Sequence, residues 1–138
     1  MPDKNIEITE SKDFTANEVV SIYEANKWSS AKKPDQLTMA LKNSDTLLLA
    51  RQNGKLIGLA NAISDGYLVV YYPHLLIHPD VQGLGVGKLI MDRMKEKYGH
   101  LHQQILVSDG GTVEFYKKCG FEIAGDTQSM WVYKGGDH

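Results

Sequence analysis

The residues best suited to chemistry lie in one run, Leu75 to Leu89, which reads Leu-Leu-Ile-His-Pro-Asp-Val-Gln-Gly-Leu-Gly-Val-Gly-Lys-Leu. Its three glycines carry no Cβ, so the backbone can adopt a positive φ and approach a ligand closely, with several N–H groups facing one concavity. An apolar run precedes the glycines, and an amphipathic helical pattern follows them. The unpaired amides and the positive dipole end of that helix would face the turn. The spacing therefore predicts an anion site suited to a diphosphate.

Two other phosphate-binding motifs fit this run poorly. The loop of nucleotide hydrolases requires Gly-x-x-x-x-Gly-Lys-Ser/Thr, but Gln82 replaces the first glycine and Leu89 follows Lys88. The dinucleotide fingerprint requires Gly-x-Gly-x-x-Gly, and Lys88 stands at its last position. A dinucleotide-binding fragment stays an alternative, which binding of a nicotinamide or flavin cofactor would distinguish.

The run instead matches the pattern Gln/Arg-x-x-Gly-x-Gly/Ala through Gln82, Gly85 and Gly87. About thirty residues later, the segment from Phe115 to Phe121 reads Phe-Tyr-Lys-Lys-Cys-Gly-Phe and matches Phe-Tyr-x-x-x-Gly-Phe. Two motifs in this order are more specific than either alone. Together they resemble the GNAT superfamily of acyl-CoA-dependent N-acetyltransferases.

This resemblance implies an enzyme that uses acetyl-CoA as its co-substrate and no metal. The backbone of Leu75, Leu76 and Ile77 would pair with the pantetheine arm. Asp109 would contact the same arm, at a position where relatives often carry Asn. The pyrophosphate would lie next to Gln82 and be surrounded by Gly83, Leu84, Gly85, Val86, Gly87 and Lys88. Lys88 also fits a solvated lysine in the first turn of the helix.

The reaction requires three groups from the protein. A fixed N–H, for which the Ile77 amide is the candidate, would stabilise the oxyanion. By its place in the second motif, Tyr116 would protonate the departing thiolate, although a core aromatic packed beside Phe115 and Phe121 is the alternative. The attacking amine must also lose a proton, because an alkyl amine with a pKa near ~10.4 is almost fully charged at pH 7.

The general base and the acceptor are left open. Relatives often place Glu on the strand after the glycine-run helix, where this chain has Gln103 and Gln104. The remaining candidates for the base are Asp65, His74, His78 and Asp109. The acceptor is expected to be a primary amine of a small molecule or a peptide. A non-catalytic acyl-CoA-binding module is the alternative function.

The other elements follow from local signals. Thr15 and Glu18 form a capping box that predicts a helix start, Asn53-Gly54 predicts a hairpin, and Pro73 requires a strand edge or a bulge. Gly99 is expected to end the glycine-run helix in a left-handed conformation. Two closing strands are predicted at residues 121–124 and 129–133.

These signals give the order β-α-α-β-β-β-α-β-α-β-β, which is the order that the resemblance implies. The expected fold class is α/β (α+β), a GNAT fold with a central mixed, mostly antiparallel sheet. The resemblance also implies that the sheet is splayed between its fourth and fifth strands.

The composition limits the functional classes. The chain has 138 residues, of which 42% are hydrophobic and 23% charged, so one domain over 1–138 is expected. The net charge of −2 argues against a nucleic-acid partner. No apolar run is long enough for a membrane span, and a single Cys119 excludes an internal disulfide. The prediction is a cytoplasmic protein, and the apolar residues 130–133 favour a homodimer.

Overall fold

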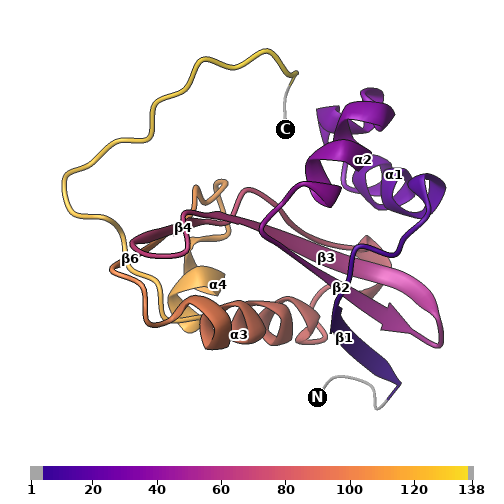
Figure 1. The fold of residues 1–138 in the computed structure, drawn as a ribbon, viewed down its shortest axis with the longest axis horizontal. Coiled ribbons are helices and arrows are strands. Elements are labelled where there is room, and N and C mark those ends of the chain that lie inside the picture. The colour runs from indigo at the N-terminus through magenta and orange to yellow at the C-terminus, as the bar shows by residue number, and fades with distance from the viewer. Residues whose placement is uncertain (1–4, 137–138) are drawn as a thin grey trace.

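The structure is a computed structural model that describes residues 5–136. In this part of the chain, a six-stranded sheet lies between α1 and α2 on one face and α3 and α4 on the other (Figure 1). The elements are β1 (Ile6–Glu10), α1 (Ala16–Ala25), η1 (Ser29–Lys32), α2 (Pro34–Lys42), β2 (Thr46–Gln52), β3 (Lys55–Ser64), β4 (Val69–Tyr71), β5 (Leu75–Ile77), η2 (Pro79–Val81), α3 (Val86–Tyr98), β6 (Gln103–Ile105) and α4 (Val113–Lys118).

The sheet has the order β1-β2-β3-β4-β6, with β5 paired to β3 beside β4. All of these pairs are antiparallel except β4 with β6, which is parallel. The β2–β3 hairpin turns at Asn53 and Gly54, whose φ angles of 51° and 83° are the positive values that a two-residue primed turn requires. The predicted hairpin and the mixed, mostly antiparallel sheet are therefore confirmed.

Two apolar clusters hold the layers together. In β2, Leu47 and Leu49 pack with α1 and α2, whereas Leu48 and Ala50 pack with α3 on the other face. Successive side chains of a strand point to opposite faces, so a strand covered on both sides must be a continuous apolar run. This explains why the segment around β2 shows no polar alternation in the sequence.

Around Pro73, where the sequence predicts a strand edge or a bulge, the chain forms two separate strands, β4 and β5. Asn61 of β3 spans the interruption: its backbone N–H donates to the His74 carbonyl at 3.2 Å, and its Oδ1 accepts from the His74 N–H at 3.0 Å. β4 continues to pair with β6 up to the hydrogen bond between the Tyr72 N–H and the Ile105 carbonyl, while β5 pairs with β3 alone. Beyond the Tyr72–Ile105 hydrogen bond, the sheet thus splays between β5 and the chain that continues from β6, as expected.

The start of α1 agrees with the sequence prediction, whereas the end of α3 does not. The Thr15–Glu18 capping box forms at α1, with both reciprocal hydrogen bonds present. The prediction for Gly99 is wrong: its φ is −62°, a right-handed value, and its N–H donates to the Lys95 carbonyl at 2.7 Å. This is the regular α-helical hydrogen bond between residues i and i−4, so the helix ends without a left-handed residue.

The two closing strands are also absent from the described residues. Residues 121–136 contain no assigned strand, and every residue from 122 to 136 is exposed. A strand needs a paired neighbour, and this segment leaves the sheet after α4 and arches around the molecule toward α2 (Figure 1, yellow).

Over residues 5–136, no helix combines the length and the apolar character of a bilayer span.

Candidate functional site

One cavity of about 590 Å³ collects most of the residues that the two motifs single out. It lies between β5, the glycine turn with the start of α3, and α4. Of the predicted site residues, the cavity is lined by Leu75, Leu76, Ile77, Gln82, Gly83, Gly85, Val86, Gly87, Lys88 and Tyr116. Leu84 and Asp109 lie outside its lining. The two motifs, which are separate in the sequence, therefore form opposite walls of one cavity.

The glycines of the turn serve two different purposes. Gly83 and Gly85 have φ angles of 84° and 88°, in the region that favours glycine, and a Cβ at Gly83 would meet nothing within 4 Å. Gly87 does not use a positive φ, which corrects the sequence prediction. It lies inside α3, and a Cβ there would come within 3.1 Å of the Phe115 ring. Gly87 thus lets α4 pack closely against α3.

Only alternate residues of β5 direct their backbone N–H and C=O groups away from β3. The His78 N–H donates to the Ile57 carbonyl, and Leu76 is opposite Leu59 in the same register, so the N–H and C=O of Leu76 point toward β3. Leu76 therefore cannot pair with a ligand through its backbone, contrary to the prediction, and its side chain is buried. Leu75 and Ile77 point the other way, into the splay.

A polar clamp fixes the strand end to the turn. Gln82 donates from Nε2 to the Ile77 carbonyl at 3.0 Å and to Asn26 Oδ1 at 3.2 Å, and Asn26 donates from Nδ2 to the same carbonyl at 3.2 Å. With its carbonyl held, the Ile77 peptide keeps one orientation. Gln82 is thus a positioning residue for the strand end. Asn26 was not found from the sequence, because a lone Asn after a helix carries no distinctive signal.

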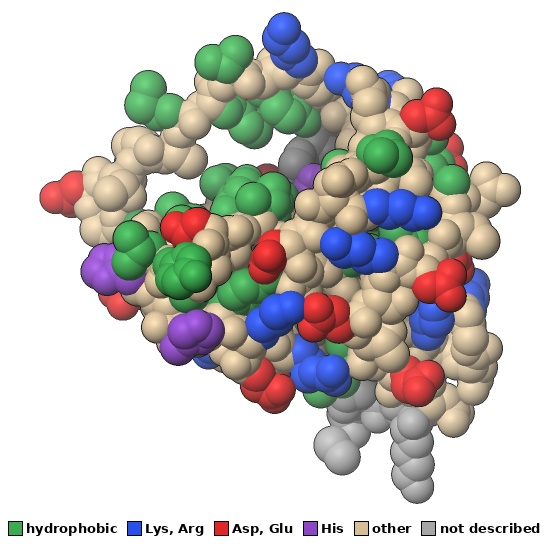
Figure 2. Space-filling view, in the orientation of Figure 1, with side chains coloured by type: hydrophobic (Ala, Val, Ile, Leu, Met, Phe, Trp, Pro, Cys, Tyr) green, Lys and Arg blue, Asp and Glu red, His purple; other side chains and the backbone are tan. Residues whose placement is uncertain are grey.

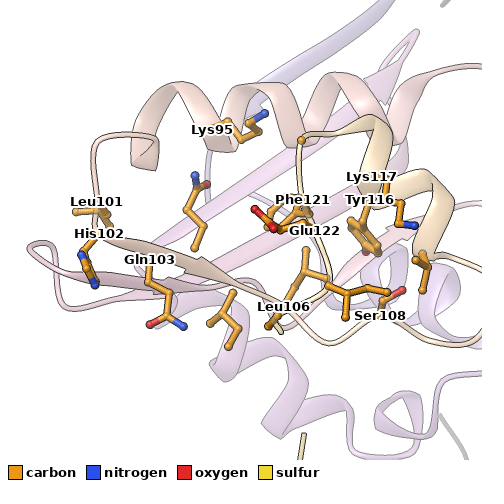
Figure 3. A pocket seen from close by; sticks show the side chains of 16 residues that line it. Lys95, Leu101, His102, Gln103, Leu106, Ser108, Tyr116, Lys117, Phe121 and Glu122 are labelled. Atoms are coloured by element: carbon orange, nitrogen blue, oxygen red, sulfur yellow. The ribbon is translucent and has the colours of Figure 1, made fainter. Parts of the chain in front are cut away.

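Tyr116 lies at the junction of two cavities. It lines the turn cavity and also a groove of about 440 Å³ along β6 (Figure 3). Its ring packs edge-on against Phe115 and Phe121, with centroids 5.0 and 6.0 Å apart. Burial raises the pKa of Tyr116 to about 12, with smaller contributions from the nearby Cys119 and Asp109. The phenol is therefore fully protonated at neutral pH and can donate a proton but not act as a base.

The charged groups around the turn are mostly cationic. Lys88 donates to Asp92 at 3.0 Å, and this hydrogen bond raises the pKa of Lys88. Lys118 of α4 lines the cavity from the opposite wall and is a second cation that the sequence reasoning did not single out. Cys119 lies beside it, and burial raises the pKa of its thiol. Among residues 5–136, no three His, Cys, Asp or Glu side chains lie close enough to hold a metal ion.

The four candidates for the base occupy different environments. Asp65 accepts backbone N–H bonds from Tyr67, Leu68 and Val69, which lower its pKa and tie it to a turn. His78 accepts at Nδ1 from the Asp80 N–H. Asp109 lies before α4, where its carbonyl accepts from Thr112. His74 is next to the site, because its ring lies 5.0 Å from that of Trp28, which lines the turn cavity.

The His74 ring is held by its neighbours. Its Nδ1 lies 2.6 Å from the Tyr23 hydroxyl, and its backbone is fixed to Asn61. Tyr23 is fully buried, and burial raises its pKa, so it stays a neutral phenol. This contact orients the imidazole in the segment between β4 and β5.

Comparisons with known proteins agree on one domain type. The model of the acetyltransferase (GNAT) domain matches residues 10–131. The uncharacterized N-acetyltransferase ycf52 of Pyropia yezoensis is 32% identical over 132 residues, which cover 86% of this chain and 76% of that protein. A GNAT-family acetyltransferase from Streptococcus pneumoniae has a similar structure, with a TM-score of 0.82 at 25% identity, over 94% of this chain and 98% of that one. An aminoglycoside N-acetyltransferase solved in complex with CoA shares the fold alone, with a TM-score of 0.68 at 14% identity, over 94% and 93% of the two chains.

Proposed function

Because this chain belongs to the GNAT acetyltransferase family, we propose that it transfers the acetyl group of acetyl-CoA to a primary amine of a small molecule or a peptide. The observation that carries the proposal is the turn cavity. It brings an open glycine turn, two outward-facing peptide groups of β5 and a protonated tyrosine together in one space.

The cavity fits the parts of acetyl-CoA in their order. The pyrophosphate requires N–H donors and positive charge, which the start of α3, Lys88 and Lys118 supply. The open space at the Gly83 Cα leaves room for it. The pantetheine arm contains two amides, and the outward N–H and C=O of Leu75 match one of them as an added strand would. The Ile77 carbonyl is occupied by Asn26 and Gln82, so only the Ile77 N–H stays available on that residue. The co-substrate supplies the acyl thioester.

Two residues of the chain would move protons. Tyr116 would donate its hydroxyl proton to the thiolate sulfur that leaves. His74 would accept the proton of the amine, directly or through water, because its ring packs against Trp28, which lines the cavity. The Ile77 N–H would stabilise the oxyanion, since Asn26 and Gln82 hold the carbonyl of that residue in place.

An amine panel tests the proposal. The chain is incubated with acetyl-CoA and each of a set of arylalkylamines, polyamines and lysine peptides, and free thiol is followed with a thiol reagent. Mass spectrometry then identifies the acetylated product. We expect thiol release with at least one primary amine and none with its N,N-dimethyl analogue, which cannot form a stable amide.

A thermal-shift measurement separates the alternative functions. We expect acetyl-CoA, but not nicotinamide or flavin dinucleotides, to raise the Tm. Stabilisation by acetyl-CoA without turnover on any amine would favour a non-catalytic acyl-CoA-binding module. No stabilisation by acetyl-CoA would contradict the proposed function altogether.

A further inference from the structure

We propose that Trp28 sets the length of the acyl chain that the turn cavity accepts, so that the protein uses acetyl-CoA and rejects longer acyl-CoA thioesters. Trp28 is then a specificity-determining residue that touches the acyl group. This inference rests on the proposed function, because it concerns the donor substrate of that reaction. Its support is the place of the indole ring in the cavity and the contacts that hold the ring there.

Trp28 lies next to the position that the acyl carbon must occupy. That carbon has to reach the Ile77 N–H and Tyr116, and both residues line the turn cavity together with Trp28. Asn26, two residues before Trp28, donates to the Ile77 carbonyl at 3.2 Å, which keeps this part of the chain beside the end of β5. The Trp28 ring also lies 5.0 Å from the His74 ring. The groups assigned to the reaction thus all lie around the part of the cavity that Trp28 lines.

The backbone of Trp28 is fixed by the turn that ends α1. The Trp28 N–H donates to the Tyr23 carbonyl, and the Lys27 N–H donates to the Glu24 carbonyl, both at 3.0 Å. These two hydrogen bonds form a Schellman motif, which requires a left-handed residue before Trp28. Lys27 has the required φ of 61°, a value that residues with a side chain adopt uncommonly. Such strain persists only where the surrounding contacts define the conformation, so the direction in which Trp28 leaves the helix is fixed.

The indole ring is held as well as the backbone. Trp28 packs edge-to-face against Tyr23, with centroids 5.8 Å apart and planes at 86°, and against His74, with planes at 88°. Tyr23 and His74 are in edge contact with each other, with centroids 5.4 Å apart, and Tyr23 is fully buried. Because each of the three rings contacts the other two, the indole cannot turn away from a ligand without losing favourable aromatic contacts.

His74, against which the indole packs, is anchored in turn. Its N–H donates to Asn61 Oδ1 at 3.0 Å, and its carbonyl accepts from the Asn61 N–H at 3.2 Å. Asn61 is 4% exposed and donates from Nδ2 to Ser44 Oγ at 3.0 Å. Displacement of His74 would break hydrogen bonds of this buried amide, which is costly. A longer acyl chain therefore cannot gain space by pushing His74 aside.

Acyl groups that differ only in methylene units carry the same polar atoms, so the cavity can distinguish them only by the space it offers. A fixed wall rejects an added methylene because the extra atoms must displace packed side chains. One methylene in an apolar pocket typically changes kcat/KM by about 10–200-fold. We therefore expect the wild type to prefer acetyl-CoA over butyryl-CoA, whose acyl group is longer, by about tenfold or more.

Calorimetry with free CoA, acetyl-CoA and butyryl-CoA, without any amine, tests the wall independently of turnover. We expect the wild type to bind acetyl-CoA about tenfold or more tightly than butyryl-CoA, and Trp28→Ala to bind the two thioesters with equal affinity. Free CoA carries no acyl group, so its affinity should be the same in both proteins. This internal reference separates a change at the acyl group from a general loss of the cavity.

The kinetic measurement uses an amine that the panel identifies, with acetyl-, propionyl- and butyryl-CoA as donors. Because Trp28 also contacts His74, Trp28→Ala should lower kcat for every donor, and the readout is therefore the ratio of kcat/KM for butyryl-CoA to that for acetyl-CoA. This ratio should rise about tenfold or more. Trp28→Phe keeps an aromatic ring beside Tyr23 and His74 and should admit propionyl-CoA but not butyryl-CoA.

Trp131→Ala is the matched control for the loss of an indole. Trp131 is 72% exposed, outside the lining of the turn cavity, on the C-terminal segment of residues 121–136. This segment stands off the body of the molecule, with an opening between them (Figure 2). The donor ratio of the control should equal that of the wild type.

Two results would overturn the role of Trp28 and leave acetyl transfer intact. A wild type that binds butyryl-CoA as tightly as acetyl-CoA would refute the steric wall without the use of a variant. An unchanged donor ratio in Trp28→Ala, with a raised KM for the amine, would place Trp28 on the acceptor and not on the acyl group. A wild type that binds neither CoA nor its thioesters would contradict the proposed function itself.

Discussion

Tyr116→Phe is the most direct test of the proposed chemistry, because it removes one O–H and keeps the ring. The ring contacts with Phe115 and Phe121 remain, and across residues 5–136 the hydroxyl accepts or donates no hydrogen bond that would be lost. We therefore expect a change in the free energy of unfolding within about 0.5 kcal/mol. The effect on turnover should be much larger.

The expected size follows from the pKa of the donor. Without Tyr116, water must protonate the thiolate, and its pKa of about 15.7 exceeds the value of about 12 for Tyr116 by roughly 3.7 units. If about half of this difference appears in the rate, as for a proton half transferred in the transition state, kcat falls by about 10²-fold. A tyrosine at its ordinary pKa would give a loss closer to 10³-fold.

The same pKa sets the pH dependence. The acid form of Tyr116 is present below its pKa and is lost as the pH rises through about 12. Turnover of the wild type should therefore show no decline from tyrosine ionisation between pH 9 and about 11, where an ordinary tyrosine would already lose its proton.

Stopped-flow or steady-state kinetics at saturating amine and acetyl-CoA, with chemistry rate-limiting, measures kcat. Tyr67→Phe is the matched control, since Tyr67 is 86% exposed in a turn away from the cavity, and it should leave kcat unchanged. A Tyr116→Phe enzyme with near-wild-type kcat would refute the role of the hydroxyl. A loss of Tm with turnover per folded molecule preserved would instead identify a packing residue.

Three further changes test other parts of the molecule. Gly85→Val should weaken CoA binding tenfold or more in calorimetry. Gly66→Val is the control: Gly66 has a similar positive φ, so the variant should carry the same backbone strain of about 1–2 kcal/mol but leave CoA affinity unchanged. Glu18→Gln removes the ion pair with Arg51 but keeps a side chain that can close the capping box, so it should lower the free energy of unfolding in urea titrations by about 0.5–1 kcal/mol at pH 7. Arg51 holds the Glu18 pKa below its usual range, so this stabilisation is present above the ordinary carboxyl pKa and is lost as the pH falls through the lowered one. The difference in stability between wild type and variant should therefore shrink as the pH is lowered below the ordinary carboxyl pKa. His74→Gln should reduce kcat by about 10²-fold at pH 7 with acetyl-CoA affinity unchanged, and an unaltered kcat would exclude His74 as the base.

The parts of the fold that the sequence predicts are those fixed by nearby residues. The α1 capping box needs only Thr15 and Glu18, and the hairpin turn needs only Asn53 and Gly54, because their hydrogen bonds and φ angles involve a few consecutive residues. Pro73 predicts a strand edge or a bulge because it lacks an N–H, whereas the structure has an interruption between β4 and β5. The position of the interruption relative to β3 depends on Asn61, twelve residues away, and no local pattern shows that pairing.

The candidate site divides in the same way. The spacing of the glycines and of Phe115 to Phe121 identifies two motifs, but it does not show that Gly87 is needed for contact with Phe115. The spacing also does not show that the backbone N–H and C=O of Leu76 are hydrogen-bonded to β3, while those of Leu75 and Ile77 point away from β3, toward the opening of the sheet. These features depend on register and helix packing, which join residues distant in the sequence.

The C-terminal segment, residues 121–136, shows most clearly what the sequence alone does not decide. The sequence by itself determined that residues 129–133 favour an extended conformation, because bulky apolar and β-branched residues gather there. It also determined the family motifs, the helix periodicity and the turns. Whether that segment forms a strand was decided only by the tertiary structure, since a strand is stable when another strand accepts its hydrogen bonds. In the described residues β6 pairs with β4 alone, and residues 129–133 are directed away from its free edge, with the Tyr133 hydroxyl 3.2 Å from Ser29 Oγ, so they form no strand.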